Sequence, residues 1–160
     1  MDYESGAGWM QGLTYTPVND IYFGMLTVFA HFDYEEVAWH KAPDNLRFRT
    51  EASIGSTQGP FNKFMGSVNM FAMHYCDLLS TSKTNFYFEA GIGLIYQDFR
   101  VEGQGLRFNF NPQAGCGIEF LQGEDRTYFT GFRFHHVSNG DLHEDNTGIN
   151  SAVLLLGRYF

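Results

Sequence analysis

The sequence LRFNFNPQAGCGIEF, residues 106–120, decides the fold because its side chains alternate in character with a period of two. Such alternation is the pattern of a strand whose two faces meet different surroundings. One face carries Leu106, Phe108, Phe110, Ala114, Cys116, Ile118 and Phe120, and the other carries Arg107, Asn109, Asn111, Gln113, Gly115 and Glu119. One face is therefore apolar and aromatic, while the other is polar, charged and rich in glycine or amides.

Similar segments lie on both sides of this stretch, separated by turns rich in Gly, Asp and Asn. The alternation is clear in residues 46–55 and 86–97, and residues 67–79 are apolar on both faces. The predicted strands are residues 6–17, 22–36, 46–55, 67–79, 86–97, 106–120, 128–138 and 150–160. We expect about eight strands of about ten residues, forming a single domain over residues 1–160.

Two architectures suit this set of strands. A soluble lipocalin-like barrel places apolar side chains inside, whereas a membrane barrel places them outside and fills its lumen with polar groups. Glu89 shares the polar face with Gly91 and Gly93, and small residues with paired charges fit a narrow lumen. The terminal Phe160 is typical of membrane barrels. The sequence thus favours an eight-stranded antiparallel transmembrane β-barrel. Within its lumen, Glu89 is expected to belong to an internal ion-pair network with Arg47, Arg49 or Arg107.

Composition excludes some functions. The formal net charge of -8 argues against nucleic acid as a partner. No run approaches the ~20 apolar residues of a transmembrane helix. The start, Met1-Asp2-Tyr3-Glu4, has no signal-peptide pattern. Either the sequence is a mature protein with an added Met, which we favour, or the protein is not exported. Cys76 and Cys116 allow one disulfide at most, and their apolar surroundings favour two unpaired thiols.

A candidate site lies where residues 128–138 end. Period two places Phe132, Phe134, His136 and Ser138 on one face. His and Ser two residues apart lie roughly 7 Å from each other, within reach of a bent hydrogen bond once the side chains lean together. Polar groups on a lipid-facing surface are costly and indicate function; the alternative is that the strand has already left the bilayer at this point.

The following loop adds groups that suit acyl chemistry. Asn139 and Gly140 can offer an amide or a backbone N–H to an oxyanion, and Asn146 lies in the same loop. Asn150 opens the next antiparallel strand, so it is expected to return beside His136.

These residues carry a family resemblance. HVSNG at residues 136–140, NTGI at residues 146–149 and FEAGIGL at residues 88–94 resemble the PagL family, the outer-membrane lipid A 3-O-deacylases, acyloxyacyl hydrolase-like enzymes. The resemblance implies an eight-stranded barrel in the outer membrane of a Gram-negative bacterium. It also implies a Ser–His–acid site on the outside of the barrel wall, facing lipid A, lipopolysaccharide and the other lipids of that membrane.

The resemblance assigns roles to the site. It implies Ser138 as nucleophile and His136 as general base, with Asn139 and Asn146 as oxyanion or positioning groups. The family typically has Glu twelve positions after the serine, where this chain has Asn150. Asn can orient an imidazole but supplies no charge. The chain therefore uses Asn150 as the third catalytic residue, recruits Glu144 or Asp145, or is slow or inactive.

The implied reaction is ester hydrolysis through an acyl-enzyme, with no metal or cofactor required. Phe132, Phe134, Leu154 and Leu156 are expected to hold acyl chains. The alternative function is a non-catalytic barrel that serves as an anchor or a component of a membrane assembly, which Asn150 favours. A homodimer or a membrane-complex subunit stays open.

Two histidines are interpreted as structural. His135 faces the lumen by parity and is expected to be a satisfied polar residue. His143, beside three acids in the loop, matches no metal-binding spacing and is expected to be solvated.

Overall fold

The computed structural model describes residues 3–35, 41–59, 62–123 and 125–160. Strands dominate the described chain, in the order β1 Tyr3–Thr16, β2 Ile21–Asp33, β3 Leu46–Gln58, β4 Phe64–Tyr75, β5 Thr84–Gln97, β6 Phe108–Phe110, β7 Gln113–Gln122, β8 Asp125–Val137 and β9 Ile149–Tyr159. A 3-10 turn, η1 Asp77–Leu79, takes the end of the predicted strand at residues 67–79. Among the described residues, no helix is long and apolar enough to cross a membrane.

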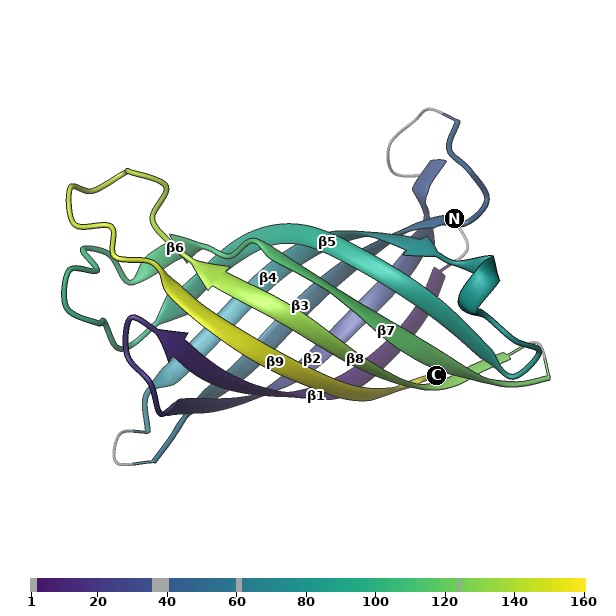
Figure 1. Ribbon diagram of the computed structural model, residues 1–160, viewed down its shortest axis with the longest axis horizontal. Coiled ribbons are helices and arrows are strands. Elements are labelled where there is room, and N and C mark those ends of the chain that lie inside the picture. Colours follow the sequence, from purple (N-terminus) through teal and green to yellow (C-terminus); the bar gives the residue numbers. More distant parts are fainter. Residues whose placement is uncertain (1–2, 36–40, 60–61, 124) are drawn as a thin grey trace.

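The sheet closes on itself. Neighbouring strands pair antiparallel around the ring, β1 pairs with β9, and β4 pairs with β5. β6 and β7 both pair with β5 in one register, because Leu94 faces Phe110 and Gly91 faces Gln113. β6 and β7 are therefore two segments of one interrupted strand and count as one strand of the barrel. The prediction of an eight-stranded antiparallel barrel is confirmed (Figure 1).

The prediction of one unbroken strand over residues 106–120 is wrong in detail. The ladder is interrupted between Phe110 and Gln113, where Pro112 has no N–H to donate. Residues 98–107 form a loop, so Arg107 is exposed and binds Asp98 at 2.6 Å instead of facing the lumen.

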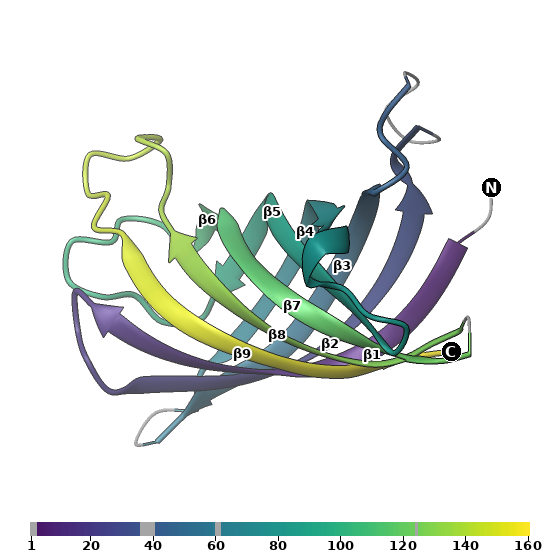
Figure 2. The same ribbon diagram turned by 45° about the vertical axis from the view of Figure 1, so that its right-hand side comes forward.

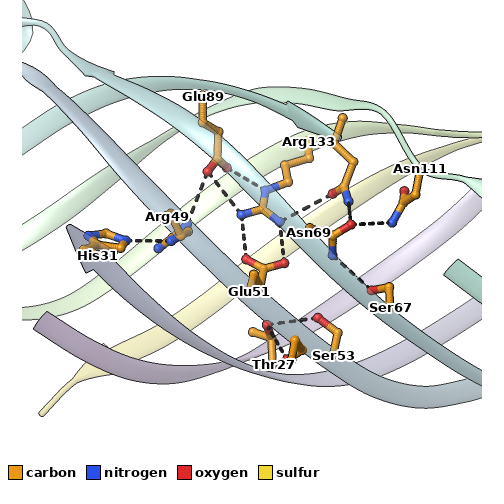
Figure 3. Close-up of polar contacts among 12 residues, drawn as sticks. Thr27, His31, Arg49, Glu51, Ser53, Ser67, Asn69, Glu89, Asn111 and Arg133 are labelled. Carbon is orange, nitrogen blue, oxygen red and sulfur yellow. Dashed lines mark hydrogen bonds and ion pairs between the residues drawn. The ribbon is translucent and has the colours of Figure 1, made fainter. Parts of the chain in front are cut away.

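The distribution of side chains confirms that the apolar face is outside. Large exposed apolar residues include Leu26, Val28, Ile54, Val68, Ile92, Leu94, Phe134, Leu154 and Leu156. The lumen holds buried charges. Arg133 binds Glu51 through Nη1 and Nη2 at 2.9 and 3.0 Å and Glu89 through Nε at 2.6 Å. Arg49 contacts Glu89 at 3.2 Å and donates from Nε to His31 Nε2 at 2.6 Å (Figure 3).

This cluster bears out the internal network predicted for Glu89, with Arg49 and Arg133 as its partners. Arg47 lies at the barrel end and pairs with Asp33 there.

The start of β1 and the end of β9 lie at one end of the barrel, and the connections at residues 98–107 and 138–148 lie at the other, which we call the loop end (Figure 1). The loop end carries the candidate site.

Candidate functional site

His136 and Asn150 face each other across the β8–β9 pair. In β8 the odd positions Arg133, His135 and Val137 are buried in the lumen, so His136 projects from the outer wall. Its ring nitrogen Nδ1 lies 2.6 Å from Asn150 Oδ1. Because an amide oxygen only accepts, the imidazole proton is on Nδ1, and Nε2 is left as the basic nitrogen.

Asn150 has a second contact. Its Nδ2 donates to Thr16 Oγ1 at 2.7 Å, so the amide bridges β8 to the end of β1. Glu144 and Asp145, the alternative partners for the histidine, are exposed loop residues, and neither carboxylate contacts His136 in the described part of the chain. The structure therefore gives the orienting position to Asn150.

Gly148 leaves room for the histidine. A Cβ built at Gly148 would lie 2.6 Å from His136 Cε1, closer than non-bonded carbon atoms approach. The N-x-G-I motif thus includes a glycine whose absent side chain makes space for the imidazole.

Ser138 follows β8 directly and is half-buried. Its backbone pairs with Phe110 in both directions, at 2.8 and 3.1 Å. The expected Ser–His hydrogen bond is not formed: within the described residues the Ser138 hydroxyl has no hydrogen-bond partner. The bridge to Phe110 fixes only the Ser138 backbone, so the Ser138 side chain can still change its rotamer. Hydrogen bonds between catalytic groups commonly tighten only when substrate binds.

Asn139 and Asn146 brace the loop. Asn139 donates twice: its backbone N–H to Asn146 Oδ1 and its side-chain Nδ2 to the Asp145 carbonyl, each at 2.8 Å. Asn146 Nδ2 donates in turn to Asp141 Oδ1, also at 2.8 Å. Asn139 is only 1 % exposed. Both asparagines already donate within the loop, and an oxyanion role for either stays a prediction.

Gly140 offers a freer donor. It lies in the left-handed region at φ 62°, followed by Asp141 at 63°. Its backbone N–H donates to no described residue, so this group is available to an anion beside Ser138.

The loop at residues 138–148 packs on the loop at residues 98–107 (Figure 2). Gln104 bridges to Asn146, and Gly105 N–H donates to the Asp145 carbonyl at 2.9 Å. A polar cleft of about 610 Å³ lies between these loops, lined by Arg100, Arg107, His143 and neighbouring residues.

An apolar track leads away from the site along the outer wall. Phe134 is opposite Ala152 and Phe132 is opposite Leu154, one step further from His136 on the same face. Phe134, Leu154 and Leu156 are each about 60 % exposed. The four predicted acyl-contact residues therefore share one surface with His136.

The remaining polar candidates lie apart from this surface. His135 points into the lumen as predicted, 6 % exposed with its ring 5.8 Å from that of Phe23, but its Nδ1 has no partner among the described residues. His143 Nδ1 accepts the Asp145 N–H at 3.0 Å. Cys76 and Cys116 are both free thiols.

Sequence reasoning missed Thr16 and the steric role of Gly148. Thr16 gave no signal, because it closes a weakly patterned strand. Gly148 was within a recognised motif, but its contact with His136 depends on the path of the loop.

Comparison with known proteins gives a consistent result. The family described as lipid A 3-O-deacylase (PagL) matches residues 21–159. No curated protein sequence matches. The crystal structure of the outer membrane enzyme PagL is similar over 98 % of both chains, with 23 % identity and a TM-score of 0.65. Neisserial surface protein A is similar at 12 % identity and a TM-score of 0.67, over 98 % of this chain and 95 % of its own. These structural likenesses show the barrel fold, and the match over residues 21–159 shows that the chain belongs to the PagL family of lipid A 3-O-deacylases.

Proposed function

We propose that this protein hydrolyses an acyl ester of lipid A with Ser138 as nucleophile and His136 as general base, at the lipid-facing surface of the barrel. The observation that carries the proposal is the His136 Nδ1 to Asn150 Oδ1 contact of 2.6 Å on the outer wall. This contact leaves Nε2 of His136 free to accept a proton. Ser138 lies two residues further along the chain, and its hydroxyl has no hydrogen-bond partner among the described residues.

The reaction follows from these positions. Ser138 Oγ attacks the ester carbonyl as its proton passes to His136 Nε2, and the Gly140 N–H donates to the resulting oxyanion. The tetrahedral intermediate collapses, the proton moves to the leaving sugar alcohol, and an acyl-Ser138 ester remains. Water, deprotonated by His136, then releases the fatty acid and restores the serine.

The apolar track explains how a lipid reaches this site. The acyl chain lies along Phe132, Phe134, Leu154 and Leu156, so it need not leave the hydrophobic layer for its ester to reach Ser138. The ester linkage sits near the polar headgroup, which matches a site placed where the strands give way to loops.

We also propose that the barrel lies in the outer membrane of a Gram-negative bacterium with its loop end outward. The exposed apolar wall and the family support this location. This orientation places the loops at residues 98–107 and 138–148, and with them the candidate site, on the outer side.

The test is mass spectrometry of lipid A incubated in detergent with the purified protein, with Ser138→Ala and with Ser151→Ala. Ser151 is a matched control, because it lies in the adjacent strand but is buried in the lumen. We expect loss of one hydroxyacyl chain with the wild type and Ser151→Ala, and intact lipid A with Ser138→Ala.

Deacylation by Ser138→Ala would assign the chemistry to another nucleophile. Intact lipid A with the wild type, under conditions where another lipid A deacylase works, would instead favour the non-catalytic barrel.

A further inference from the structure

Thr16, the last residue of β1, contacts the candidate catalytic groups. Its hydroxyl accepts from Asn150 Nδ2 at 2.7 Å, and Asn150 Oδ1 accepts from His136 at 2.6 Å. Three strands thus meet in one chain of hydrogen bonds on the outer wall. Thr16 lies outside residues 21–159, the part of the chain that the family matches.

A β-bulge brings Thr16 to this place. Thr14 is opposite Ser151, but the next residue opposite Asn150 is Thr16 and not Tyr15. Thr14 is buried and bonds Ser151 in the lumen at 3.0 Å, so strict alternation would point Thr16 inward as well. The extra residue re-aims Thr16 toward the outer wall, which is a frequent use of bulges at barrel rims.

The placement of Asn150 matters more than that of a carboxylate at the same position would. A carboxylate has two equivalent oxygens and a charge, so either oxygen holds the Nδ1–H of a histidine. An amide has one accepting end only. If the amide turned over, its NH₂ would face Nδ1, the imidazole proton would move to Nε2, and His136 could not take a proton from Ser138.

We propose that Thr16 is a positioning residue that holds the Asn150 side chain in the rotamer that presents its amide to His136. This inference rests on the proposed function of the site. The contact keeps the Asn150 side chain beside the imidazole, whereas a carboxylate in its place would be held there by its own charge-assisted hydrogen bond to His136.

The experiment compares Thr16→Val and Thr16→Ser in the wild type and in an Asn150→Asp background, with deacylation rates measured in detergent. Thr14→Val is the matched control, because it removes a hydroxyl of the same strand that faces the lumen. We expect Thr16→Val to lower kcat about 3- to 10-fold, the equivalent of one hydrogen bond. Thr16→Ser and Thr14→Val should stay within about twofold, and Thr16→Val should cost less than about twofold in the Asn150→Asp background.

A second readout is independent of activity. The ¹⁵N shifts of the labelled His136 ring report which nitrogen carries the proton. Wild type should show the proton on Nδ1, and Thr16→Val should show a mixture of the two tautomers.

Equal losses from Thr16→Val in both backgrounds, or an unchanged tautomer in Thr16→Val, would overturn the positioning role. A wild type with no deacylase activity but with the expected tautomer change would uphold the role of Thr16 while removing the proposed function.

Discussion

At the scale of single residues, the base of the candidate site is oriented by a neutral partner. Asn150 accepts the Nδ1–H of His136 at 2.6 Å, as a carboxylate would, but it cannot stabilise the positive imidazolium that forms when His136 takes a proton. In serine proteases, replacing the acid of the triad with Asn lowers kcat by about 10⁴-fold, chiefly through the wrong tautomer. Here the Asn150 oxygen faces Nδ1 and favours the tautomer that a base requires, so under the proposed mechanism the missing charge is the main difference from a carboxylate.

Asn150→Asp should therefore raise the rate of lipid A deacylation. Aspartate has nearly the same shape, so it keeps the contacts with His136 and Thr16 and adds a negative charge next to the imidazolium. We expect an increase of about tenfold or more in kcat, which is about 1.4 kcal/mol of transition-state stabilisation.

Time courses of fatty-acid release by mass spectrometry measure this effect. Leu142→Asp is the control, because it adds the same charge at an exposed position of the neighbouring loop without contacting the His136 ring. An Asn150→Asp variant that is no faster than the wild type would mean that imidazolium charge does not limit the reaction.

Much of the site at residue scale could be predicted from the sequence. Period two placed His136 and Ser138 on the outer face, and the antiparallel return placed Asn150 opposite His136. The contact of Thr16 could not be predicted, because it depends on the bulge between Thr14 and Thr16. A single extra residue changes which face a side chain takes, and the local sequence carries no pattern that marks it.

At the scale of elements, the site depends on a loop fastened at several points. The loop at residues 138–148 is held internally by Asn139 and Asn146 and externally by Gln104 and Gly105. The family resemblance indicated these asparagines as oxyanion or positioning groups. Their hydrogen bonds fix the path of the backbone around Gly140, which only the three-dimensional loop reveals, and an oxyanion role stays a prediction.

Asn146→Ala should loosen this loop and slow the enzyme. The change removes the acceptor for the Asn139 N–H and the donor to Asp141, two hydrogen bonds of about 0.5–1.5 kcal/mol each. We expect faster hydrogen exchange in residues 139–148 and a drop of about 10-fold in deacylation, with the barrel itself intact.

Hydrogen exchange read by mass spectrometry gives the local effect. Glu144→Ala is the matched control, since Glu144 is exposed in the same loop and has no hydrogen bond to a described residue. Equal exchange in the wild type and Asn146→Ala would show that the loop does not need these bonds.

At the scale of the whole molecule, the barrel separates a polar, charged interior from an apolar exterior. The sequence predicted this division well, since period two holds over most strands and the charges fall on one face. It did not predict Arg133 as the central cation. Arg133 is in β8, and its pairing with Glu51 of β3 and Glu89 of β5 reaches across the lumen between strands that are not neighbours.

That network makes a prediction about stability, because its charges have no access to solvent. Arg49, Glu89 and Arg133 have fully buried side chains, and Glu89 contacts both arginines. Removing Glu89 would leave Arg49 without its carboxylate and Arg133 with Glu51 alone. An uncompensated buried charge costs several kcal/mol, whereas an exposed ion pair contributes little.

Glu89→Ala should therefore lower the free energy of unfolding by about 3–5 kcal/mol. Urea unfolding in detergent, followed by tryptophan fluorescence, measures it. Asp98→Ala breaks the exposed pair with Arg107 and should leave the midpoint almost unchanged. Replacing Glu89 and Arg49 together by Gln and Met should recover part of the loss, because fewer buried charges then lack a partner. If Glu89→Ala unfolds at the same urea concentration as the wild type, water or ions within the lumen must screen the arginines, and the ion pairs do not hold the strands together.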